Sequence, residues 1–143
     1  MISRAERQRG SVLMLMPAAV LVVLLLAAIS VDLSLVFLRQ RQASGVAVDV
    51  ANDLASAALD EGAFRSTGEF TLDPDRAERL GRAFIDSSDL AGDVVDVDIE
   101  VIGPDAVRVA LTVRVEYLFA KAIPGAADGT TVSAHATAVA VPG

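Results

Sequence analysis

The sequence predicts an α+β protein in which a long N-terminal helix packs on a three-stranded antiparallel sheet, with a short second helix between them. Three observations predict this fold. An uncharged apolar run occupies residues 11–31, small apolar residues recur at helical spacing after it, and the period changes to two beyond residue 88. The part of the chain after the apolar run is long enough to bury one small core.

The apolar run has the length and composition of a membrane-spanning helix. Residues 12–31 would form a helix about 30 Å long, which matches the hydrocarbon thickness of a bilayer. Twelve of these twenty residues are Leu, Ile or Val, and together they favour insertion by about 4 to 7 kcal/mol. Pro17 lies in the first turns, where the loss of a backbone donor is least disruptive. Leu24 lies within the span and Asp32 is the first charge after it. We take Pro17, Leu24 and Asp32 as the candidate residues for membrane-helix assembly, with the lipid bilayer as a partner.

The charges on the two sides of the run differ in sign. The stub of residues 1–10 has a net charge of about +2, and the body of residues 32–143 has about −9. This asymmetry favours a single-pass protein of the cytoplasmic membrane with a cytoplasmic stub, a transmembrane helix at 11–31 and an extracytoplasmic body. Cleavage of a signal peptide after Ser30 is the alternative. The run is longer than a typical signal h-region, and helical patterning continues beyond it.

The helix is expected to continue beyond the membrane as an amphipathic segment from Asp32 to Glu61 and to end at Gly62. Its apolar stripe is shallow because three of its five members are alanine, and such a stripe suits close packing. The stripe consists of Ala43, Ala47, Val50, Leu54 and Ala58.

The rest of the body is predicted to be a connection over 63–72, a short helix and a three-stranded meander. Asp73 is a typical N-cap and Pro74 a typical first helical residue. Apolar and polar residues then alternate over 94–102, 107–119 and 132–141, with turn residues between the runs. In the first run the inward-facing residues are expected to be Val95, Val97, Ile99 and Val101.

Composition argues against several functions. The chain has no cysteine and one histidine, His135, so thiolate chemistry and histidine metal clusters are excluded. The acidic run over 93–100 alternates with valine, which indicates a solvated strand face rather than a calcium loop. An acidic body disfavours nucleic-acid binding. We expect no enzyme activity, cofactor, metal site or small-molecule substrate.

The chain resembles the TadE/TadG-like proteins of the tight-adherence (Tad, or Flp) type IV-related pilus machinery. The resemblance is strongest over residues 7–60. It rests on an Arg-Gly-containing start before a single apolar helix, an aliphatic-Asp pair, a Gln-Ala step into an Ala- and Asp-rich helix, and a closing Ala-rich strand. These are Arg9-Gly10-Ser11-Val12, Val31-Asp32, Gln42-Ala43 and the run SAHATAVA.

The resemblance implies a pilin-like fold and a minor pilin or pseudopilin-like role, with other pilin-like subunits and assembly-platform proteins as partners. It also implies possible prepilin-type processing between Gly10 and Ser11. The fifth residue after Gly10 is Leu15 rather than the glutamate of processed pilins. We therefore expect an anchored or minor accessory subunit rather than the bulk filament subunit. The alternative is a signal-anchored extracytoplasmic binding domain unrelated to pili.

Overall fold

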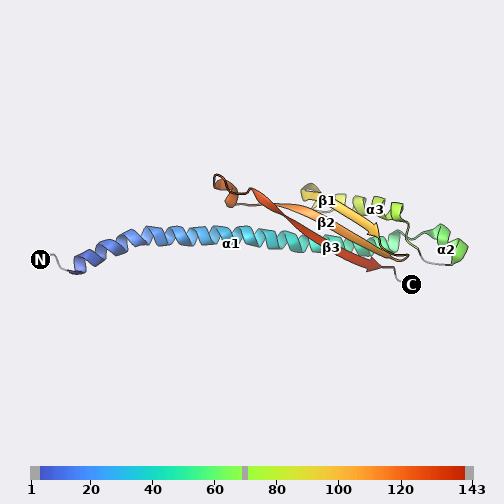
Figure 1. Ribbon diagram of the computed structural model, residues 1–143, viewed down its shortest axis with the longest axis horizontal. Helices are drawn as coiled ribbons and strands as arrows, with labels where there is room; N and C mark the ends of the chain where they lie inside the picture. The colour runs from blue at the N-terminus through green and yellow to red at the C-terminus, as the bar shows by residue number, and fades with distance from the viewer. Residues whose placement is uncertain (1–3, 69–70, 141–143) are drawn as a thin grey trace.

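A computed structural model describes residues 4–68 and 71–140, with side chains from Leu15 onward apart from that of Thr67. The protein is a long helical rod with a small body along its C-terminal half (Figure 1). The predicted α+β class, with a long N-terminal helix, a short helix and a three-stranded antiparallel sheet, is confirmed. The elements are α1 (Arg4–Ala57), α2 (Glu61–Thr67), α3 (Pro74–Asp86), β1 (Val94–Val101), β2 (Ala106–Glu116) and β3 (Gly129–Val139), with 3-10 turns η1 (Ala91–Asp93) and η2 (Ala120–Ala122).

Helix α1 is continuous from the apolar run into the body. No proline or glycine lies between Pro17 and Gly45, so no residue that disfavours helix interrupts this stretch. The helix ends at Ala57, five residues before the Gly62 predicted to stop it. Gly62 instead lies in the first turn of α2, where Asp60 is the N-cap and accepts hydrogen bonds from the backbone N–H groups of Gly62 and Ala63 at 2.8 and 3.0 Å. The irregular connection predicted over 63–72 was therefore wrong for residues 63–67, which belong to a capped helix of two turns.

The sheet is a meander in the order β1-β2-β3, with both pairs antiparallel. In β2, Val107, Val109, Leu111, Val113 and Val115 all face inward and are buried. The predicted inward alternation of β1 fails at its first member. A register shift between Val94 and Asp96 leaves Val95 59% exposed and turns Val94 toward the core. Such a bulge adds one residue to the strand and reverses the facing of the residues before it.

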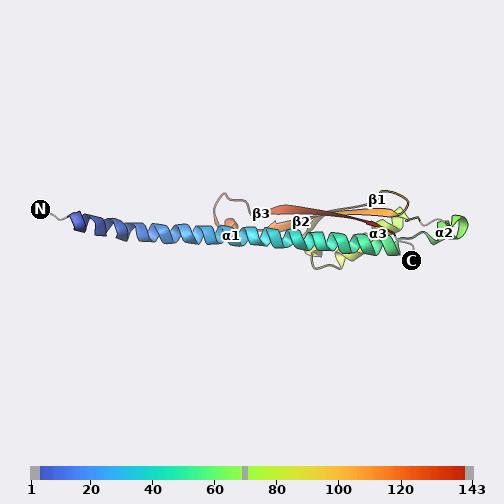
Figure 2. The same cartoon turned by 90° about the horizontal axis from the view of Figure 1, so that it is seen from below.

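The core lies between the inner face of the sheet and two helices. Figure 2 shows α1 running beneath β2 and β3. All five residues of the predicted apolar stripe are buried, at 0–4% exposure. All five belong to core clusters that include residues of the sheet, and the third strand contributes alanines such as Ala134 and Ala138 to these clusters. Small residues on both surfaces let the helix approach closely.

Helix α3 covers β1 and begins as predicted. Asp73 accepts a hydrogen bond from the backbone N–H of Arg76 at 3.1 Å, and Pro74 is the first helical residue. Gly81 is buried where α3 meets both α1 and the sheet. A Cβ atom at this position would clash with Ile99 and would lie 3.0 Å from Leu54 Cδ1. The glycine therefore sets the close approach of α3.

Candidate functional site: the apolar segment and the Asp32 junction

The N-terminal part of α1 is long and apolar enough to cross a membrane. It contains an 18-residue window of mean hydropathy 2.8, of which only 6% is buried inside the protein. Leu24 is 61% exposed and Pro17 is also exposed. Gly10 and Ser11 lie in the helical backbone of α1, but their side chains are outside the described ones. A surface this apolar is unfavourable in water, and lipid or other apolar helices would cover it.

Asp32 follows the apolar run, and it is the one buried charged or polar residue among the described side chains, at 7% exposure. Its carboxylate accepts three backbone hydrogen bonds from the β2–β3 connection. Oδ1 accepts from the N–H groups of Leu118 at 2.7 Å and Phe119 at 3.1 Å, and Oδ2 accepts from that of Ala120 at 2.9 Å. Three successive N–H groups that face one anion form a concave anion-binding site.

These contacts explain how a carboxylate is tolerated at the end of an apolar helix. Burial by itself raises the pKa of Asp32, but the hydrogen bonds from Ala120, Phe119 and Leu118 together outweigh burial and hold the pKa below its usual value. The carboxylate therefore stays ionised at neutral pH. In this form it satisfies donors at the start of η2 that would otherwise need water.

Two further contacts fix α1 to the body within the next turns. Arg39 Nη2 forms a 3.0 Å ion pair with Asp93 Oδ2, next to β1. Gln40 Nε2 donates a hydrogen bond to the backbone carbonyl of Ser133 in β3 at 2.8 Å. Together with Asp32, they attach one stretch of helix to three separate parts of the body. The junction between the apolar N-terminal segment and the body is thus held by specific polar contacts as well as by apolar packing.

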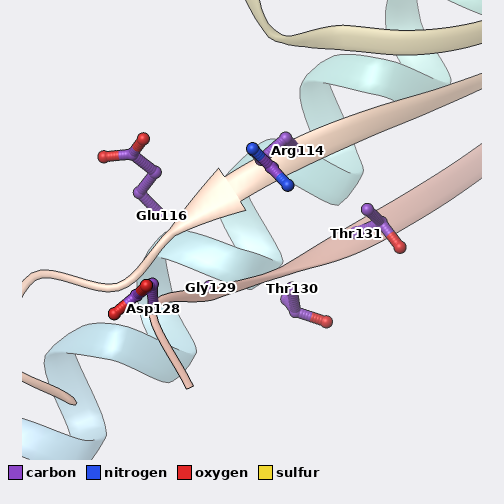
Figure 3. Close-up of a pocket in the computed structure, with 6 residues that line it drawn as sticks. All are labelled: Arg114, Glu116, Asp128, Gly129, Thr130 and Thr131. Carbon is purple, nitrogen blue, oxygen red and sulfur yellow. The ribbon is translucent and has the colours of Figure 1, made fainter. Parts of the chain in front are cut away.

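Other surfaces offer weaker candidates. A hollow of ≈ 540 Å³ lies where β2 ends and β3 begins, lined by Arg114, Glu116, Asp128, Gly129, Thr130 and Thr131. Figure 3 shows that its charged side chains do not converge on one point, and none of its lining residues is buried. It therefore lacks the enclosed, convergent polar groups of a ligand site.

The described acidic and histidine side chains also form no catalytic or metal-binding cluster. Among the described residues, no three His, Asp or Glu side chains are arranged to hold a metal ion. Glu100 on the outer face of β1 pairs with Arg108 at 3.6 Å, its direct cross-strand neighbour. His135 is exposed on β3. These groups are explained as a solvated sheet face.

No family model, no curated protein and no solved structure matches the chain. The candidate site is therefore defined by its own geometry, which combines an exposed apolar helix with the Asp32 junction. Sequence reasoning selected Asp32 as the first charge after the span. It missed the connection at 118–120, because backbone donors have no signature in the sequence.

Proposed function

We propose that the protein is a membrane-anchored minor pilin or pseudopilin-like accessory component of a Tad-type pilus assembly or secretion system. The observation that carries the proposal is the single helix α1, whose side chains from Leu15 to Val31 are largely apolar and exposed and whose later turns pack on the body. An element of this kind joins a membrane segment rigidly to an exported domain. The resemblance over residues 7–60 supplies the Tad assignment.

The proposed orientation places the basic stub in the cytoplasm and the body outside it. The arginines at positions 4, 7 and 9 support this arrangement, since basic residues are retained on the cytoplasmic side. Arg39 and Arg41 lie just beyond the span and would oppose it, but Arg39 is paired with Asp93. We propose no catalytic role, because no described group of side chains offers one.

The proposed partners are the bilayer, other pilin-like subunits and platform proteins. Their contact surface is the uncovered side of α1, which bears large apolar side chains beyond the span as well as within it. Phe37 is 70% exposed and Leu33 is 63% exposed. Helices associate in membranes through van der Waals packing of their facing surfaces, and exposed apolar side chains are available for such packing.

Site-specific photo-crosslinking in the native host tests the proposal. A benzophenone amino acid at Phe37 is expected to crosslink to pilin-like or platform proteins, identified by mass spectrometry. The same group at Val139, 54% exposed on the body, is the matched control. Crosslinks from Phe37 to lipid alone, with none to such proteins, would favour the anchored binding domain and refute the assembly role.

N-terminal sequencing of the membrane-extracted protein tests the anchoring separately. A start at Met1 indicates an unprocessed anchor, and a start at Ser11 indicates prepilin-type processing; both keep the apolar helix. A start at Val31 would mean that the helix is removed as a signal peptide, and the proposal would then be wrong.

A further inference from the structure

Exposed apolar side chains of the body are concentrated at the end nearest the membrane segment. Beyond residue 31, eleven large apolar side chains are exposed among those described, and six of them lie at this end. Three are on α1 and three are on the β2–β3 connection. They are Leu33, Phe37, Leu38, Leu118, Phe119 and Ile123, at 45–70% exposure. The other five lie on α1, α2, β1, the β1–β2 turn and β3; they are Val48, Phe64, Val95, Ile102 and Val139.

The β2–β3 connection is fixed at the level where the apolar span ends. Asp32 is the next residue after the span, and a helix rises only about 1.5 Å per residue. The backbone N–H groups of Leu118, Phe119 and Ala120 lie within 2.7–3.1 Å of its carboxylate. If residues 12–31 fill the hydrocarbon, these groups lie at its boundary, because the headgroup layer extends only about 5–7 Å further. Figure 1 shows this connection beside α1, at the end of the sheet that faces the N-terminal half of the rod.

The composition of this connection suits a membrane interface. Residues 117–127 contain one tyrosine, one phenylalanine, leucine and isoleucine, and a single charge, Lys121. Aromatic and aliphatic side chains with a nearby lysine are typical of segments that lie in the headgroup and upper acyl region. The acidic residues Glu116 and Asp128 flank the segment on the side of the sheet. Glu116 lies 4.0 Å from Lys121, so the charge of the segment's lysine is balanced at the end of β2.

We infer that residues 117–127 form a second membrane contact, which rests in the lipid headgroup layer beside the spanning helix and inserts Leu118, Phe119 and Ile123. This inference rests on the membrane anchoring in the proposed function. The bilayer is the occupant because the segment is tied to the end of the span, so the lipid surface meets it wherever the helix is inserted. A second copy of the chain could cover residues 117–127 only if it presented an apolar surface at the same depth in the membrane, whereas lipid is always present there.

Single-tryptophan fluorescence tests the inference, since the chain has no tryptophan of its own. Full-length Phe119→Trp is reconstituted into phosphatidylcholine–phosphatidylglycerol vesicles, with and without bromine on the acyl chains. Its emission is expected to shift to shorter wavelength and to be quenched by the brominated lipid. Ile123→Trp, at a second exposed position of the segment, is expected to behave in the same way.

Two controls separate the possible failures. Val139→Trp lies at the opposite end of β3 and is expected to show neither shift nor quenching. Leu24→Trp, in the span, is expected to be quenched strongly. If Leu24→Trp is quenched while both segment reporters remain in water, the second contact is refuted and the anchor stands. A blue shift without quenching would mean that protein covers the segment, which also overturns the inference. Absence of quenching at Leu24→Trp would refute the anchor itself.

Discussion

Replacing Leu24 by arginine is the sharpest perturbation of the membrane segment. The side chain is 61% exposed, and the surrounding window is almost entirely uncovered, so the protein offers the guanidinium no polar partner there. Arginine at the centre of a span costs about 2.5 to 3.5 kcal/mol on insertion scales, and loss of the leucine removes about 0.3 to 0.6 kcal/mol more. The total of about 3 to 4 kcal/mol offsets about two fifths or more of the roughly 4 to 7 kcal/mol by which the aliphatic residues favour insertion. The partition coefficient should fall by about 100- to 1,000-fold.

Resistance to alkaline carbonate extraction measures this change. The wild-type protein is expected in the membrane pellet, and Leu24→Arg largely in the extract or degraded. Val48→Arg is the matched control, because Val48 is 47% exposed on the same helix but lies well beyond the span. It should leave the protein in the pellet. If Leu24→Arg remains in the pellet as fully as the wild type, residues 11–31 do not anchor the protein as an exposed span, and the reasoning fails.

Three further predictions concern the junction and the core. Asp32→Asn replaces one acceptor oxygen with an N–H₂ donor, so the backbone amides of residues 118–120 should exchange faster with deuterium. Asp49→Asn, on the exposed face of α1, is the control and should leave these exchange rates unchanged. Folding lowers the pKa of Asp32, so its contribution to stability is complete above the ordinary pKa of 3.8 and is lost as the pH falls through the lowered pKa. The amide NMR shifts of residues 118–120 should therefore titrate with a midpoint below pH 3.8, and a midpoint at or above that pH would contradict the assignment. Gly81→Val should lower the free energy of unfolding, measured by chemical denaturation, by about 1–3 kcal/mol through overpacking. Gly45→Ala has open space around it and should raise the free energy of unfolding by about 1 kcal/mol. Equal effects of the two substitutions would refute the packing role of Gly81.

The parts of the fold that could be predicted depend on local, periodic signals. The stripe from Ala43 to Ala58 follows the helical repeat, and every member is buried. The Asp73-Pro74 cap and the alternation of β2 are equally local, and both are confirmed. Such features follow from backbone geometry that repeats over a few residues, so a single sequence contains them in full.

The parts that could not be predicted depend on contacts between distant segments or on single irregular residues. Asp32 accepts hydrogen bonds from backbone N–H groups that lie 86–88 residues further along the chain. Almost every residue has such a group, so the sequence does not show which ones Asp32 binds. Because of the bulge, Val94 faces the core and Val95 faces outward. The sequence has valine at both positions, so its pattern fits either register. Asp60 was not predicted as a helix cap because the helix predicted from Asp32 to Glu61 includes it.

The absence of a helix-breaking residue between Pro17 and Gly45 has a mechanical consequence. Spanning helices change tilt when the bilayer thickens or thins. Because α1 passes into the body without a break and is attached there by Asp32, Arg39 and Gln40, a change of tilt rotates the whole sheet by the same angle. If α1 spans a bilayer as proposed, the far end of the rod would swing furthest, so the reach and direction of the body above the lipid surface would vary with the thickness of that bilayer.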